Sequence, residues 1–122
     1  MYNSNEKIRA FESDFMKKKV KDNHIYSSLI IGLGKIGMYY DLTLDHNKYI
    51  YTHSSANSLH PKFNLIGGVD SNTDACKVFT EKYHVKSFKS ISAALSEVKP
   101  EIVIVSTSSI SHLKIIRQVI KK

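Results

Sequence analysis

The chain has 122 residues and a formal net charge of +7, with 42% hydrophobic and 24% charged residues. This length predicts one domain with one core and excludes a cofactor domain joined to a separate substrate domain, since each such unit needs about 100–150 residues. A basic balance indicates a nucleic-acid partner only where the charge is concentrated. The densest run, MKKKVK at 16–21, is flanked by Asp14 and Asp22. We therefore expect a solvated helix face and no nucleic-acid partner.

Cysteine usage and hydropathy bear on the compartment. The single cysteine, Cys76, allows no intrachain disulfide, which is typical of a reducing compartment. No apolar stretch reaches the length of a membrane span, and the beginning of the chain, MYNSNEKIRAFESDF, lacks the apolar core of a secretory signal. These features predict a cytoplasmic protein without a membrane partner.

The chain begins with a segment that we expect to be a helical leader, residues 1–24, ahead of the domain at 25–122. Its apolar residues Ile8, Phe11 and Phe15 recur at helical spacing. Two interpretations stay open. The helix either mediates docking, with a homodimer as one outcome, or it is an arm packed on its own domain or frayed at the chain end.

From residue 25 onward, predicted strands and helices alternate. Strands are predicted at 25–31, 63–69, 85–90 and 101–106. Helices are predicted at 34–42, 52–60, 71–84, 91–98 and 108–122, the last with Ile110, Leu113, Ile116 and Ile120 at helical spacings. Strands that lack inside/outside alternation and are separated by helices predict a parallel sheet covered on both faces. Right-handed crossovers give the order 3-2-1-4, so the expected fold is α/β, an incomplete, doubly wound, Rossmann-like sheet of about four strands with an extra N-terminal helix.

The stretch SSLIIGLGKIGMYYDL, residues 27–42, places three glycines at G-x-G-x-x-G spacing between a strand and a helix. In a dinucleotide-binding turn, Gly32 makes the tight bend, Gly34 lets the backbone approach a pyrophosphate, and Gly37 lets the helix pack closely on the strand. The free N–H groups at that helix end would hold phosphate oxygens. Lys35 lies inside the turn, either adding charge there or serving as an ordinary surface lysine.

Asp70 follows the second strand, where an acid accepts hydrogen bonds from the adenosine ribose and repels a 2′-phosphate. No arginine follows it in the next two positions, so we expect NAD, with NADP less favoured. The alternative is that Asp70 only caps the following helix. It lies beyond the usual spacing of about 20 residues from the glycines. We expect the excess to be an insertion within 42–61, between the first helix and the second strand, at little cost in loop closure.

Together with VDSNTD and EIVIVSTSSISH, the turn GLGKIG resembles the N-terminal domain of the glucose–fructose oxidoreductase/myo-inositol dehydrogenase (Gfo/Idh/MocA) family over residues 25–122. That family has a basic residue and an isoleucine inside the turn, here Lys35 and Ile36. Its H-x-x-A before the second strand is matched by His53 and Ala56. Its T-P-x-x-x-H loop after the fourth strand is matched at 107–112, with serine in place of the proline.

The resemblance implies an NAD(P)-dependent oxidoreductase that acts on a sugar, cyclitol or related polyol by hydride transfer. The implied cofactor-binding residues are Gly32, Gly34, Lys35, Ile36, Gly37, Asp70, Ser106, Thr107 and His112. The alternative for His112 is a helix residue with a satisfied imidazole. His53 could approach the cofactor or substrate, and the alternative is a lone surface histidine. His24, His60 and His84 show no ligand-like pairing, so we expect no metal site.

The family's E-K-P motif, whose lysine assists proton transfer and positions the substrate, would follow residue 122. We therefore expect a cofactor-binding portion, truncated before that lysine and before the substrate domain, with no catalytic residue of its own and no polyol or sugar substrate without that domain. Two alternatives stay open: a stand-alone NAD-binding sensor or partner-binding module without catalysis, and an S-adenosylmethionine-binding Rossmann domain.

Overall fold

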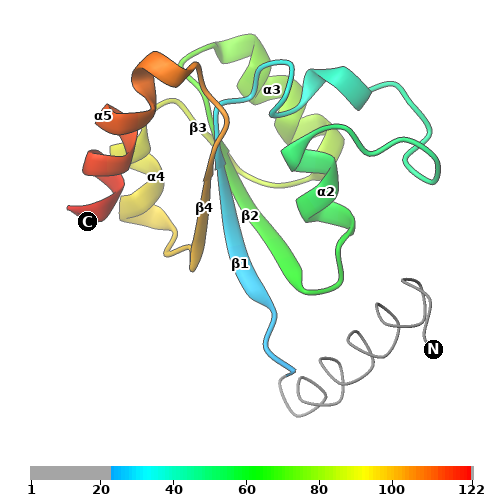
Figure 1. Cartoon of the computed structure of the whole chain (residues 1–122), viewed down its shortest axis with the longest axis horizontal. Helices are drawn as coiled ribbons and strands as arrows, with labels where there is room; N and C mark the ends of the chain where they lie inside the picture. Colours follow the sequence, from blue (N-terminus) through cyan, green and yellow to red (C-terminus); the bar gives the residue numbers. More distant parts are fainter. Residues whose placement is uncertain (1–22, 122) are drawn as a thin grey trace, which may run out of the picture.

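The computed structural model describes residues 23–121, so the helix expected at the beginning of the chain lies outside the described residues. Four parallel strands form one sheet in the order β3-β2-β1-β4 (Figure 1). They are β1 (Tyr26–Ile31), β2 (Phe63–Val69), β3 (Ser87–Phe88) and β4 (Ile102–Val105). The predicted α/β class, the parallel pairing and the strand order are confirmed.

Helices cover both faces of this sheet. They are α2 (His53–Leu59), α3 (Thr73–Tyr83), α4 (Ile91–Glu97) and α5 (Ser109–Ile120), with a short 3-10 helix, η1 (Tyr39–Asp41). Figure 1 shows α2 and α3 on one side and α4 and α5 on the other. Thr52, Asn72 and Ser90 cap three of the helices, each side chain accepting from the amide three residues on.

The core has one cluster on each face of the central strand β1. Ile30 packs with Phe79 of α3 on one face, while Leu29 and Ile31 pack with Ile91 of α4 on the other. This split explains the unbroken apolar run of β1, because successive side chains of a strand point to opposite faces and both faces are covered. The apolar strand β4, at the edge of the described sheet, is only half-buried along its length.

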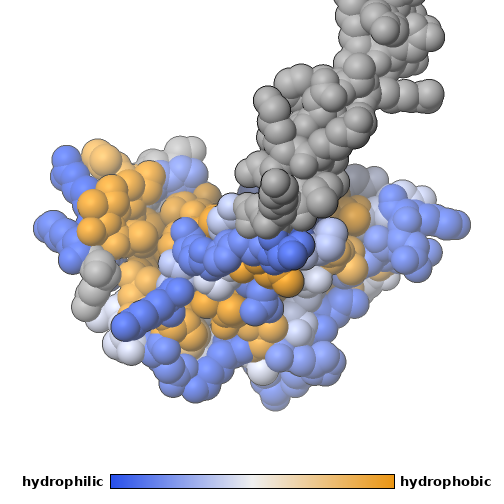
Figure 2. Space-filling model, turned by 90° about the horizontal axis from the view of Figure 1, so that it is seen from below, coloured by the Kyte–Doolittle hydropathy of each residue, from blue (hydrophilic) through white to orange (hydrophobic). Residues whose placement is uncertain are grey.

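The spacing of apolar residues predicted α5 but not its buried side. Ile115 and Val119 pack onto the sheet. Leu113, Ile116 and Ile120, which recur at helical spacings, are instead 60%, 43% and 77% exposed. Figure 2 shows apolar side chains at the surface on the side of the molecule that carries α5.

The α-helix predicted at 34–42 is wrong. The glycine turn continues as hydrogen-bonded turns through Met38 and then as η1. Tyr39 N donates to Gly34 O (3.0 Å) and Tyr40 N to Lys35 O (3.0 Å), five residues back instead of four. The backbone therefore leaves the α-helical path directly after the third glycine.

The helix that should follow the glycines resumes after a detour. His53 N donates to Ile36 O (3.1 Å) and Ser54 N donates to Gly37 O (3.0 Å). In a continuous α-helix those two carbonyls would accept from residues 40 and 41. The insertion thus interrupts the first helix, at about 38–52, instead of lying between that helix and β2 as predicted.

Candidate functional site

The glycine turn follows β1 and has steric limits at two of its three glycines. Gly32 has φ +100°, and a Cβ there would lie 2.8 Å from Thr107 Cγ2. A Cβ on Gly37 would lie 2.0 Å from Gly32 O. A Cβ on Gly34 would meet no atom within 4 Å. The turn is therefore tight at its first and third glycines and faces open space at its second, as a phosphate-binding turn requires.

The amides of the turn divide into satisfied and free donors. Leu33 N donates to Asp70 Oδ2 (2.8 Å), and Met38 N donates to Gly34 O (2.8 Å). Between these two, the N–H groups of residues 34–37 find no acceptor among residues 23–121. Consecutive free amides at the start of a helical turn attract an anion because both their hydrogens and the local dipole point toward it. The exposed Lys35 adds a positive charge beside them.

Asp70 joins the glycine turn to the beginning of α3. Its Oδ2 accepts from Leu33 N, and its Oδ1 accepts from Asn72 N (2.8 Å). The cap of α3 is Asn72, whose side chain accepts from Ala75 N (3.0 Å), so capping α3 is not the role of Asp70. Each carboxylate oxygen keeps a further lone pair, and the residue is only half-buried.

The side chains of two predicted site residues hold the loop after β4 by donating hydrogen bonds to main-chain oxygens. Ser106 Oγ donates to Gly32 O (2.7 Å) and His112 Nε2 donates to Thr107 O (2.7 Å). These hydrogen bonds place Thr107 against the first glycine. The structure therefore gives His112 a satisfied imidazole and gives Ser106 a contact with the turn itself.

Ser108, at the position of the family's proline, begins α5 as its N-cap. Its φ is −61° with ψ 150°, which is the region that a proline ring would impose. The backbone path of the loop is therefore compatible with the family pattern although the proline is replaced.

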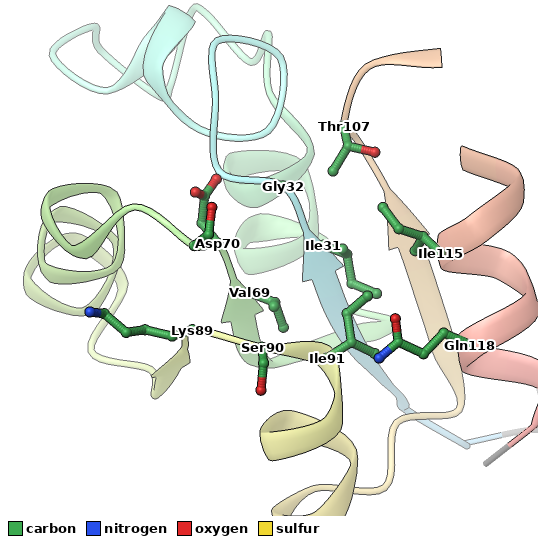
Figure 3. A pocket seen from close by; sticks show the side chains of 11 residues that line it. Ile31, Gly32, Val69, Asp70, Lys89, Ser90, Ile91, Thr107, Ile115 and Gln118 are labelled. Atoms are coloured by element: carbon green, nitrogen blue, oxygen red, sulfur yellow. The ribbon is translucent and has the colours of Figure 1, made fainter. Parts of the chain in front are cut away.

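A pocket of about 320 Å³ opens at the carboxyl ends of the strands, on the side of α4 and α5 (Figure 3). Its lining consists of Ile31, Gly32, Val69, Asp70, Ser71, Lys89, Ser90, Ile91, Thr107, Ile115 and Gln118. Three predicted site residues, Gly32, Asp70 and Thr107, meet here from three different strand ends. Ligands of open α/β sheets bind at this edge, where the chain reverses its direction of winding.

The remaining predicted residues lie elsewhere around the turn. Lys35 and the half-exposed Ile36 lie outside the pocket lining, beside the free amides. His53 begins α2 with an exposed side chain and is also outside the lining.

Sequence reasoning missed several lining residues. Lys89 and Ser90 directly follow β3, so the same strand-end rule would have found them. Ile115 and Gln118 had no such signal, since their place depends on which side of α5 faces the sheet.

Two kinds of feature are not found in the described part of the chain. Among residues 23–121, no three histidine, cysteine, aspartate or glutamate side chains are grouped so that they would hold a metal ion. In the same range, no helix has both the length and the apolar character needed to cross a membrane.

Comparisons with known proteins agree with this geometry. The family model described as an oxidoreductase family with an NAD-binding Rossmann fold, GFO_IDH_MocA, matches residues 27–122. No curated protein shows significant similarity to the sequence.

Several solved structures share the fold. A putative dehydrogenase from Bordetella bronchiseptica RB50 has a TM-score of 0.62 at 18% identity over 80% of this chain and 22% of its own. A myo-inositol dehydrogenase from Corynebacterium glutamicum ATCC 13032 has a TM-score of 0.62 at 13% identity over 80% of this chain and 25% of its own. GenD2 from gentamicin A biosynthesis, in complex with NAD, has a TM-score of 0.63 at 18% identity over 80% of this chain and 24% of its own.

This chain thus matches about a quarter of the length of each of these structures. At such low identity the likeness carries the fold, and the family rests on the model match over most of the sequence. The chain belongs to the Gfo/Idh/MocA family of oxidoreductases and contains its NAD-binding Rossmann domain.

Proposed function

We propose that the dinucleotide binds across the carboxyl edge of this sheet, with its pyrophosphate on the amides of residues 34–37. These four amides have no acceptor among residues 23–121 and a Cβ on Gly34 would meet no atom within 4 Å, and this combination carries the proposal. Lys35 would place a positive charge beside the same pyrophosphate. Ile36, an isoleucine that is 51% exposed beside these amides, offers an apolar contact to the part of the cofactor beyond the pyrophosphate.

The adenosine half is assigned to the pocket. The free lone pairs of Asp70 would accept hydrogen bonds from the ribose hydroxyls, and the adenine would lie between Thr107 and Ile115. Ser106 and His112 would act by holding Thr107 in place.

We favour NAD over NADP as the cofactor. A carboxylate at the ribose would repel a 2′-phosphate at short range. Lys89 is the cation in the pocket lining, and in Figure 3 its side chain extends away from Ile91 and Gln118. Comparing NAD and NADP affinities in Lys89→Gln tests this assignment. A loss of affinity confined to NADP would show that Lys89 reaches a 2′-phosphate and would reverse the preference.

The reaction that we propose is hydride transfer between NAD and a sugar, cyclitol or related polyol. None of the described side chains around the turn and pocket is placed as a proton-transfer base, so we assign no catalytic residue among residues 23–121. The described domain supplies the cofactor. Oxidation of a panel of polyols by the protein with NAD, followed by NADH absorbance, tests the substrate class.

Gly34→Ala is the sharpest test of cofactor binding. The added methyl meets nothing in the protein, so the fold should be unchanged, yet it would stand in the space assigned to the pyrophosphate. We expect the Kd for NAD, measured by calorimetry, to rise at least about tenfold with an unchanged melting temperature.

The matched control is Ser96→Ala, a change of one small group at an exposed position of α4. It should leave the affinity unchanged. Wild-type affinity in Gly34→Ala would overturn the placement of the pyrophosphate.

A further inference from the structure

The phosphate-binding turn and α2 behave as one helix built from two separated segments. The first two amides of α2, those of His53 and Ser54, donate to the carbonyls of Ile36 and Gly37. The amides of residues 34–37 point the other way along the same turn and are free. The position of these free donors therefore depends on how firmly the start of α2 is held against the back of the turn.

One buried carboxylate, Asp41, holds the start of α2. Its side chain has no exposed surface. It accepts hydrogen bonds from Tyr51 N (2.6 Å), Thr52 N (3.0 Å), Thr52 Oγ1 (2.8 Å) and Ser55 Oγ. These donors span the end of the insertion and the first turn of α2, so a single side chain closes the loop of residues 38–52.

The charge of this carboxylate is stabilised where it lies. Burial acts to raise the pKa of Asp41, but the hydrogen bonds from Ser55, Tyr51 and Thr52 outweigh it and hold the pKa below its ordinary value. His46 Nε2 also donates to the main-chain oxygen of Asp41 (2.8 Å), which holds the backbone of the same residue. The Asp41 side chain is therefore an ionised carboxylate that accepts hydrogen bonds from its own insertion and from α2.

Loss of this carboxylate would act directly on the turn. The amides of Tyr51 and Thr52 would lose this acceptor, and the Thr52 amide is buried, which favours local opening. These residues immediately precede His53 and Ser54, whose amides hold the turn from behind. Opening there would free the carbonyls of Ile36 and Gly37 and let the front amides move.

We propose that Asp41 is a positioning residue for the cofactor pyrophosphate. It touches no cofactor atom and acts through the start of α2, which it holds against the glycine turn. The expected effect of Asp41 on cofactor affinity rests on the proposed function. Its effect on the rigidity of the glycine turn can be measured without a ligand.

The test compares Asp41→Asn with Asp45→Asn. Both remove one negative charge from the same insertion, but Asp45 is exposed and, among residues 23–121, its side chain accepts only from Asn47 N (3.0 Å). For Asp41→Asn, we expect the Kd for NAD and for ADP-ribose to rise about tenfold, with the Kd for adenosine, followed by NMR, unchanged. A residue that only stabilised the fold would leave all three unchanged below the melting temperature or weaken all three alike, and either result would overturn the proposal.

Hydrogen exchange of the unliganded protein gives an independent measurement. The amides of Met38, Tyr39 and Tyr40, which donate to carbonyls of the turn, should exchange faster in Asp41→Asn than in wild type and should be unchanged in Asp45→Asn. Unchanged exchange in Asp41→Asn would overturn the proposal. If wild type bound neither NAD nor ADP-ribose, the proposed function would fail, and the exchange result would still decide the role of Asp41.

A milder pair of variants covers the case in which Asp41→Asn does not fold. Thr52→Val removes a hydroxyl that donates to Asp41 and caps α2, whereas Thr52→Ser keeps that hydroxyl. Thr52→Val should lose less NAD affinity than Asp41→Asn and should show faster amide exchange at residues 38–40 than wild type. Thr52→Ser should match wild type in both measurements. Equal behaviour of the two variants would contradict the proposal.

Discussion

Asp70 and Asp41 are two carboxylates near the glycine turn that differ in burial. Asp70 is bonded to the turn itself and Asp41 to the start of α2. Asp70 is half-buried, accepts from two amides and keeps lone pairs toward the pocket. Asp41 is fully buried and accepts from four donors. The comparison shows that the less buried Asp70 keeps acceptor capacity for a further donor, whereas the donors around Asp41 lie in its own insertion and in α2.

The largest effect should come from the turn that both acids hold. Gly37→Ala places a methyl 2.0 Å from Gly32 O, a main-chain atom that cannot move aside as the end of a flexible side chain could. We expect the free energy of unfolding to fall by about 3 kcal/mol and NAD binding to be lost, measured by urea denaturation and calorimetry. Gly34→Ala, at the open glycine of the same turn, is the control for stability, since its free energy of unfolding should be unchanged. A stable Gly37→Ala protein that binds NAD would contradict the steric reading of the turn.

Conservative variants of the two acids should differ in the stability that they lose and in their effect on the choice between NAD and NADP. Asp41→Asn replaces one of the two acceptor oxygens by an amino group that meets the donors around it, so we expect a loss of about 3 kcal/mol in the free energy of unfolding. Asp70→Asn should cost about 1 kcal/mol, because its contacts lie nearer to solvent, while weakening the binding of NAD relative to NADP. Urea denaturation and paired NAD and NADP titrations measure both. Equal losses of stability in the two variants would remove the distinction drawn here.

The smallest effects concern pH. Asp41 has a pKa below its ordinary value of 3.8 in the folded protein, so the unfolded chain binds a proton more readily. Its stabilisation is therefore complete above about pH 5 and is lost as the pH falls through 3.8 toward the folded value. The urea midpoint should fall less between pH 6 and pH 3 in Asp41→Asn than in wild type. A parallel fall in both proteins would contradict this linkage.

Glu101 precedes the amino end of β4 and is an exposed carboxylate with which the buried Asp41 can be compared. The hydrogen bonds from His24 Nε2 and from Ser27 N lower the pKa of its carboxyl below the ordinary value of 4.5. The sign of its linkage is the same as for Asp41, but the group is exposed and is screened by salt. Glu101→Gln should therefore change the pH profile less than Asp41→Asn does, and high salt should abolish that change.

Much of the fold and part of the site could be predicted from local patterns. The strand ends at Ile31 and Val69, the tight bend at Gly32 and the acid at Asp70 follow from residue types at short spacings. The same patterns failed for the helix at 34–42. The carbonyls of Ile36 and Gly37 are taken by amides 17 residues further along the chain, and no local pattern records such a partner.

The amino-acid sequence by itself determined the parallel sheet, its strand order and the place of the glycine turn, because apolar runs, crossover handedness and glycine's conformational freedom act locally or by general rule. The tertiary structure decided that the insertion interrupts the first helix, that Asp41 closes it, and that Ile115 and Gln118 reach the pocket. These features depend on which distant groups meet in the packed protein. A buried carboxylate is stabilised there by donors that only the folded chain brings together.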